Sequence, residues 1–317
     1  MSARQVVPVA AAPQHPPTSL LGRLGIFGLD GLAPVIVAAL ATEEPLLLIG
    51  PHGTGKTLLL TRVAEALGLV FRHYNASLVN FDDLVGFPLP GPGGSLDYAQ
   101  TPATIWGAEA VIFDEISRCR PDIQNKLFPI VHERRVQGLL LDGLQYRWAA
   151  MNPPSTDDDE TGYTGSEPLD TALADRFAFV VEMPGWGSLS EHEQMAVVLA
   201  GKDDWDRTAA GELNAILVSV RSAITVLQSS LSGSVAVYVR TLMALLEQAG
   251  ITLSPRRGSM LLRSVIATHA AAVALDPSVR PADSALLALL SALPQRAEGL
   301  PVPRTKVLAA HRQAWRL

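Results

Sequence analysis

The sequence has little of what several classes of protein require. Its 317 residues include one cysteine, Cys119, so no disulfide can form within the chain, and a reducing compartment, the cytoplasm, is expected. The N-terminus lacks the charged segment followed by an apolar one that marks a signal peptide. The longest apolar runs fall short of the roughly 18 residues that cross a bilayer, so we expect no membrane span.

Charge is also scarce. Only 18% of the residues are charged, the net charge is −6, and no run of Lys and Arg is present. These features disfavour a nucleic-acid-binding surface. Hydrophobic residues are abundant at 48%, which is enough for a large core, and the length favours two domains.

The clearest motif follows a short apolar run, Leu46 to Ile49. It reads Gly-x-x-x-x-Gly-Lys-Thr over residues 50–57, in the strand–loop–helix setting of a phosphate-binding loop. Its glycines let backbone N–H groups wrap a phosphate at the positive end of the following helix. Lys56 would place its charge on the β- and γ-phosphates, and Thr57 would give its hydroxyl to Mg²⁺. The predicted nucleotide-binding residues of the loop are Gly50, His52, Gly53, Thr54, Gly55, Lys56, Thr57 and Leu58.

A second apolar run, Val111 to Phe113, ends in two carboxylates. Asp114 would hold Mg²⁺ through its water shell, and Glu115 would act as general base on the attacking water. The alternative is a solvated strand end, which the phosphate-binding loop upstream disfavours.

Three further polar residues have two interpretations each. Asn152 closes a predicted strand and either hydrogen-bonds the γ-phosphate or attacking water, or forms an Asx turn before a proline. Arg176 is suited to contact a γ-phosphate, but an ion pair with Asp175 is the alternative. Arg256 opens a predicted helix of the second domain, from which it either reaches the nucleotide or lies on the surface.

Strand and helix patterns alternate as far as residue 184 and predict an α/β fold with a parallel sheet covered by helices on both faces. Within this part, 86–94 is predicted to be an irregular loop, and Pro129 to kink or end a helix that starts at Pro121. Residues 139–148 are predicted to form a hairpin with an Asp-Gly turn. After residue 184 only helices are expected, at 191–200, 212–228, 235–249, 260–275 and 282–293.

Five segments occur in the order and approximate spacing of AAA+ ATPases: the phosphate-binding loop, 111–115, 151–153, 173–177 and 254–256. The sequence most resembles the MoxR-type branch and its close relatives with a dynein-related ATPase domain. That resemblance implies a P-loop NTPase (AAA+) sheet sandwiched by helices, an all-helical lid domain, and ATP with Mg²⁺. It also implies that Asn152 is the sensor-1 residue, Arg176 the arginine finger and Arg256 the sensor-2 arginine.

The same resemblance implies an organisation and an activity. We expect a disordered tail at 1–22, a nucleotide-binding domain at 23–184 with an insert at about 86–105 facing a ring pore, a lid at 185–294 and a tail at 295–317. Family members form rings, usually hexamers, and many are chaperone-like remodellers beside a partner with a von Willebrand factor A domain. Two departures stand out: His52 occupies a position where proline is common, and 157–160 is an acidic run, either a solvated loop or a partner-binding patch.

The expected function is therefore an ATP-hydrolysing remodeller of a partner protein. A slow nucleotide switch and a nucleic-acid motor are the alternatives. The presence of Lys56, Asp114, Glu115 and Arg176 favours the remodeller over the switch, and the acidic balance disfavours the motor.

Overall fold

The computed structural model describes residues 19–94, 96–154, 166–201 and 205–316. The acidic run at 157–160 and residues 1–18 of the predicted tail lie outside the described residues. Residues 19–22, the described part of that predicted tail, are ordered. Helix α1 (Leu20–Arg23) buries Leu20 and Leu21 in the core. The ordered domain thus begins a few residues earlier than predicted.

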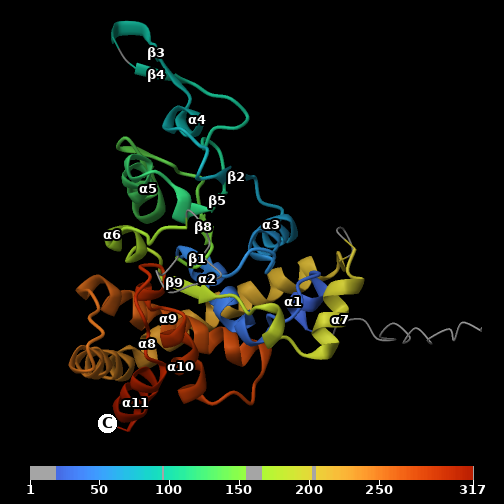
Figure 1. Cartoon of the computed structure of the whole chain (residues 1–317), viewed down its shortest axis with the longest axis vertical. Coiled ribbons are helices and arrows are strands. Elements are labelled where there is room, and N and C mark those ends of the chain that lie inside the picture. The colour runs from blue at the N-terminus through green and yellow to red at the C-terminus, as the bar shows by residue number, and fades with distance from the viewer. Residues whose placement is uncertain (1–18, 95, 155–165, 202–204, 317) are drawn as a thin grey trace, which may run out of the picture.

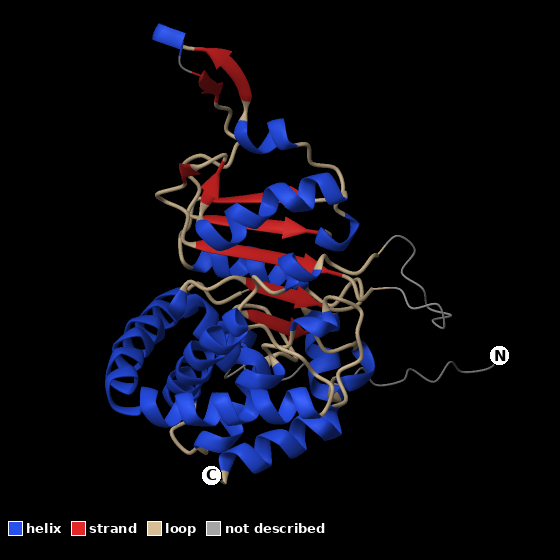
Figure 2. Ribbon diagram, turned by 90° about the vertical axis from the view of Figure 1, so that its left-hand side faces the viewer, coloured by secondary structure: helices blue, strands red, loops and turns tan. Residues whose placement is uncertain are grey.

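The centre of the molecule is a parallel sheet with strand order β2-β5-β8-β1-β9 (Figure 2). The central strands read as nearly continuous apolar runs because a parallel sheet is buried on both faces. This confirms the predicted fold class. The strands are β1 (Leu46–Ile49), β2 (Phe71–Asn75), β5 (Ala110–Asp114), β8 (Tyr146–Met151) and β9 (Phe179–Glu182).

Helices cover both faces of this sheet. Side chains alternate along each strand, so Leu46 and Leu48 join one core cluster while Leu47 and Ile49 join the other. The first cluster is completed by α2 (Ala33–Thr42) and α3 (Lys56–Ala66), and the second by α4 (Phe81–Val85), α5 (Pro121–Glu133) and α6 (Thr171–Ala174).

The insert is a regular element, which corrects the predicted irregular loop. Strands β3 (Phe87–Pro90) and β4 (Leu96–Ala99) pair antiparallel and project away from the sheet (Figure 1). Prolines are tolerated there because both strands of a two-stranded hairpin are edge strands. On the outer side of each strand, no backbone N–H group is needed for a hydrogen bond to a neighbouring strand.

The base of this insert belongs to the core, so the projecting part is shorter than the predicted 86–105. Ile105 is buried, and its N–H donates to Leu84 O at 2.8 Å. The hydroxyl of Tyr74 donates to Ala103 O at 2.7 Å. Of the described residues of the predicted insert, those that extend beyond the domain are therefore 87–94 and 96–99.

A second hairpin also differs from the prediction. Strand β6 (Arg135–Val136) pairs with β7 (Leu139–Leu140) around Gln137 and Gly138, whose φ angles of 48° and 83° are those that a tight two-residue turn demands. The Asp-Gly pair at 142–143 instead leads into β8 of the main sheet. Nor does Pro129 end its helix, because α5 continues to Glu133 with its apolar side packed on the sheet.

The second domain is helical, with α7 (Glu191–Leu199), α8 (Ala209–Gln248), α9 (Pro255–Leu275), α10 (Pro281–Leu290) and α11 (Arg304–Trp315). Helix α8 replaces two predicted helices. It runs through the serine-rich stretch 229–234, where hydroxyls bond back to helix carbonyls, as Ser230 does to Val226 O at 2.9 Å. The predicted C-terminal tail is also part of this domain, because α11 packs Val307, Ala310 and Ala314 against it.

Helices α8 and α9 are long and apolar enough to cross a membrane by length and composition. Core helices pass the same test, and both helices contribute buried side chains to the cluster that covers the sheet. Their composition therefore establishes no span.

Candidate functional site

The phosphate-binding loop links the end of β1 to the start of α3. Gly53 and Gly55 adopt left-handed φ angles of 77° and 80°, and α3 begins at the next residue, Lys56. At Gly50 a side chain would clash, because an added Cβ would lie 2.7 Å from Cβ of Met183. The loop thus needs glycine at all three positions, for conformation at two and for space at the third.

This loop borders a cavity of about 230 Å³ at the carboxyl edge of the sheet. Parallel strands end together at that edge, so side chains distant in sequence meet there. The lining includes most of the predicted loop residues together with both carboxylates and the predicted sensor-1 residue. It comprises His52, Gly53, Gly55, Lys56, Thr57, Leu58, Asp114, Glu115, Met151 and Asn152.

Lys56 is buried and joins the loop to strand β8. Its ammonium group donates to Gly50 O at 2.6 Å, to Pro51 O at 2.8 Å and to Oδ1 of Asn152 at 3.1 Å. Burial lowers the pKa of Lys56, and the nearby negative charges of Asp114 and Glu115 oppose that shift. The Asn152 side chain is thereby directed into the cavity.

Thr57 and Asp114 form the second link across the cavity. The Thr57 hydroxyl donates to Oδ2 of Asp114 at 2.7 Å, and the Glu115 N–H donates to Oδ1 at 2.9 Å. Burial raises the pKa of Asp114, but hydrogen bonds from His73, Thr57 and the Glu115 backbone outweigh it, so the pKa is lowered. Oxygen donors from one carboxylate and one hydroxyl suit Mg²⁺, which takes its other ligands from waters and phosphates.

Glu115 has an unusual backbone. Its φ of 55° lies in the left-handed region, which a non-glycine residue rarely adopts and which is common at functional sites. Its carboxylate forms an ion pair with Nε of Arg118 at 3.1 Å. The strained turn brings the side chain of Glu115 to the lining of the cavity beside Asp114.

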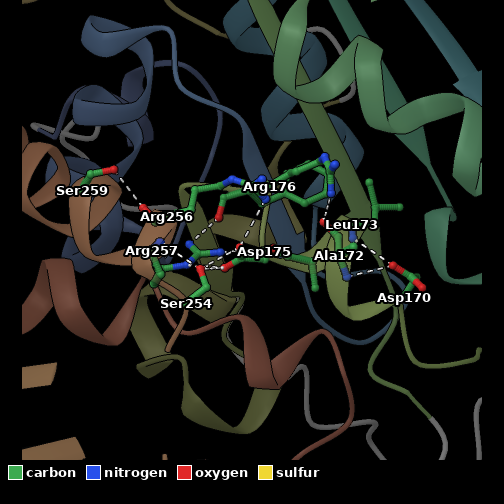
Figure 3. A network of polar contacts seen from close by, with 11 residues as sticks. Asp170, Ala172, Leu173, Asp175, Arg176, Ser254, Arg256, Arg257 and Ser259 are labelled. Atoms are coloured by element: carbon green, nitrogen blue, oxygen red, sulfur yellow. Dashed lines mark hydrogen bonds and ion pairs between the residues drawn. The ribbon is translucent and has the colours of Figure 1, made fainter. Parts of the chain in front are cut away.

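The two predicted phosphate-contacting arginines lie together, and neither lines this cavity. Figure 3 shows Asp175, the neighbour of Arg176 in sequence, beside the start of α9, where Ser254, Arg256 and Arg257 lie. Asp175 accepts hydrogen bonds from the Ser254 hydroxyl at 3.0 and 2.8 Å, and it pairs with Arg256 at 3.4 Å. The structure therefore does not bring Arg256 to the phosphate-binding loop of its own chain.

Arg176 is held by contacts other than an ion pair with Asp175, which was the alternative interpretation of its sequence position. Its guanidinium lies 4.6 Å from the ring centre of Phe128 and donates to Ala172 O. Its Nε is buried without a hydrogen-bond partner among the described residues. Burial and the charge of Arg256 lower the pKa of Arg176. A cation with an unused donor is thus presented beside a second arginine.

Sequence reasoning missed the residue that fixes this cluster. Arg257 is fully buried and donates to Phe177 O at 2.6 Å and to Asp175 Oδ1 at 3.4 Å. It therefore ties α9 to the loop that carries Arg176. A signal was available, since two adjacent arginines at the start of a helix cannot both face the same way.

A larger cavity of about 1170 Å³ adjoins the loop at Gly50 and Pro51. It is bordered by η1 (Asp30–Leu32), by the end of β9 and by the segment that precedes α11. Arg296 lines it and is paired with Glu182. Apart from Gly50, the sequence predicted no site residue among them, because they come from segments that are distant in sequence.

Comparison with known proteins agrees with this geometry. Residues 45–177 match the family described as AAA domain (dynein-related subfamily). None of the curated proteins matches the chain. A crystal structure of a candidate ATPase from Cytophaga hutchinsonii is similar in fold, with a TM-score of 0.60, 18% identity and 92% of each chain covered. Residues 45–177 thus resemble an AAA domain of the dynein-related subfamily, and the whole chain has the fold of a P-loop AAA+ protein.

Proposed function

We propose that the protein hydrolyses ATP. The observation that carries this proposal is the meeting of Lys56, Thr57, Asp114, Glu115 and Asn152 around one small cavity. These side chains supply a cation, two metal-facing oxygens, a base and a neutral hydrogen-bonding group. Together they are the parts that phosphoryl transfer to water requires.

Each residue has a role that follows from its position. Lys56, already turned toward the loop carbonyls, binds the β- and γ-phosphates, and Thr57 with Asp114 holds Mg²⁺. The metal neutralises charge on the phosphates when it is bound. Glu115 takes a proton from the attacking water, and Asn152 orients that water or the γ-phosphate.

The larger cavity is the proposed binding site for the nucleoside part of ATP. It shares Gly50 and Pro51 with the loop, so a triphosphate in the small cavity would continue into it without crossing the sheet. The mixture of apolar walls with Arg296 and Glu182 suits a base and a ribose.

Arg176 and Arg256 support a ring assembly. Both lie outside the cavity that holds the phosphates, yet both are charged, adjacent and close to the surface. We infer that they act on the nucleotide of a neighbouring subunit, which makes hydrolysis depend on assembly, and that the ring is a hexamer as in the resembled family. This assigns Arg256 to the neighbour's site and not, as the sequence suggested, to its own.

The client is proposed to be a protein, as in MoxR-type remodellers with partners that carry a von Willebrand factor A domain. The hairpin β3–β4 supports this proposal, because it projects from the domain (Figure 1). The side chains of Phe87 and Leu89 on it are exposed. Exposed apolar side chains on a projecting element are suited to gripping another chain. A cytoplasmic location remains part of the same proposal.

A trapping experiment tests the proposal. Tagged Glu115→Gln protein, which should bind ATP without turnover, is purified from cells in ATP, and the mass of the assembly is measured. The proposal expects an ATP-dependent hexamer with a bound client, and it expects the client to be lost when residues 87–99 are replaced by a short Gly-Ser link. A monomer at saturating ATP would contradict the ring, and a client retained without the hairpin would contradict the gripping role.

A further inference from the structure

His73 makes a contact that the sequence motifs do not include. Its Nε2 lies 3.4 Å from Oδ2 of Asp114, the same oxygen that accepts the hydrogen bond from Thr57. The carboxylate of Asp114 is therefore approached by three donors: the Glu115 N–H on Oδ1, and Thr57 and His73 on Oδ2.

The register of the sheet explains this position. Strand β2 pairs with β5 so that His73 lies opposite Ile112 and Asn75 opposite Asp114. Because side chains alternate, His73 is on the same face as Asp114, whereas Tyr74 points the other way and stacks on Phe113. The His73 side chain is 42% exposed, so filling the core does not account for it.

We propose that His73 is a positioning residue for the metal site, an inference that rests on the proposed function. Nε2–H of His73 donates to Oδ2 and holds the plane of the Asp114 carboxylate toward Thr57. When the Thr57 hydroxyl turns a lone pair to Mg²⁺, His73 remains as a donor on that oxygen. Hydrogen-bonding partners of this kind typically change metal affinity about 10- to 100-fold, and a long, half-exposed contact belongs at the lower end.

The test measures how much Mg²⁺ strengthens nucleotide binding, with no turnover involved. Affinity for a non-hydrolysable ATP analogue is measured by calorimetry in EDTA and in saturating Mg²⁺, at about pH 8, where an ordinary histidine is neutral. The variants are His73→Leu, which removes the donor, and His73→Gln, whose amide keeps one at a similar reach. His192→Leu on α7 is the matched control, and Thr57→Ala removes the metal ligand itself.

In His73→Leu, we expect the increase in analogue affinity that Mg²⁺ causes to fall about 10-fold, while the analogue affinity in EDTA stays unchanged. In His73→Gln, that increase should recover. The proposal is overturned if His73→Leu keeps the wild-type gain, if its affinity in EDTA falls equally, or if His73→Gln fails to recover. The proposed function fails separately. In that case the wild-type protein binds no analogue, or Thr57→Ala keeps the full Mg²⁺ gain.

Discussion

The hydroxyl of Thr57 lies 2.7 Å from Oδ2 of Asp114, although the two residues are 57 positions apart in sequence. Asp114 ends strand β5, whereas Thr57 is in helix α3, which follows strand β1, and β8 runs between β1 and β5 in the sheet. The contact exists because α3 starts at the loop and directs Thr57 across the end of β8 toward the carboxylate. It joins the two sequence motifs into one site.

Replacing Lys56 with alanine should abolish measurable binding of Mg-ATP. Its buried ammonium group would be the cation that faces the phosphates, and no other lysine or arginine lines the small cavity among the described residues. Calorimetric titration of Lys56→Ala against wild type measures the loss, with Lys126→Ala on α5 as a surface-lysine control. Unchanged affinity in Lys56→Ala would show that the loop does not hold phosphate.

Replacing Arg176 with alanine should leave ATP binding nearly intact and lower turnover about 10³-fold. The reason is that Arg176 lies outside its own phosphate cavity and would stabilise charge on a neighbour's γ-phosphoryl group. Mixing provides the measurement. Inactive Lys56→Ala subunits still carry Arg176, so adding them to Arg176→Ala subunits should restore phosphate release. Mixed rings that stay inactive at every ratio would place the action of Arg176 within its own subunit.

Replacing residues 87–99 with a short flexible link should spare folding and ATP binding but abolish remodelling. At the base of the hairpin, Gly86 and Ala99 are in contact, since a Cβ on Gly86 would lie 2.1 Å from Ala99 O. A short link can therefore close the gap without disturbing Ile105. Circular dichroism and ATP titration check the domain. A variant that unfolds would show that the hairpin belongs to the core.

Stability should fall as the pH drops below about 6.5, in part through His311. Burial lowers the pKa of His311, whose Nδ1 lies 2.9 Å from the Tyr238 hydroxyl, so the folded protein resists protonation while the unfolded chain accepts it. The contribution of His311 to the free energy of unfolding is complete above the pKa that this side chain has in the unfolded chain. It is lost as the pH falls toward the lower pKa of the folded protein. Urea unfolding at about pH 7.5 and about pH 5.5 measures it. His311→Asn keeps an acceptor without a titrating ring, so it should show a smaller loss between the two values, and an equal loss would exclude His311.

Local signals in the sequence were sufficient to predict the residues that meet at the edge of the sheet. Apolar runs, glycines and the polar residues after each strand predicted the parallel sheet, and the structure brings Lys56, Thr57, Asp114, Glu115 and Asn152 to one edge of it. These predictions rest on short-range patterns, because parallel strands end at a common edge whatever the loops between them do.

Features set by tertiary contacts were missed. Prolines in β3 suggested a loop, yet an isolated hairpin tolerates them. The sequence also predicted separate helices at 212–228 and 235–249, where α8 is continuous. The contacts of His73 with Asp114 and of Arg257 with Asp175 depend on strand register and on the angle at which α9 meets the sheet. No pattern within one segment carries that information.

The most direct test of ATP hydrolysis is steady-state phosphate release by wild type and Glu115→Gln, with ATP affinity measured on the same preparations. Glu115 sits in a strained turn at the cavity, and the amide of Gln cannot accept the proton of the attacking water. We expect turnover in the wild type, a loss of about 10² to 10⁴-fold in Glu115→Gln, and equal ATP affinity in both. Turnover by Glu115→Gln at the wild-type rate would contradict this expectation.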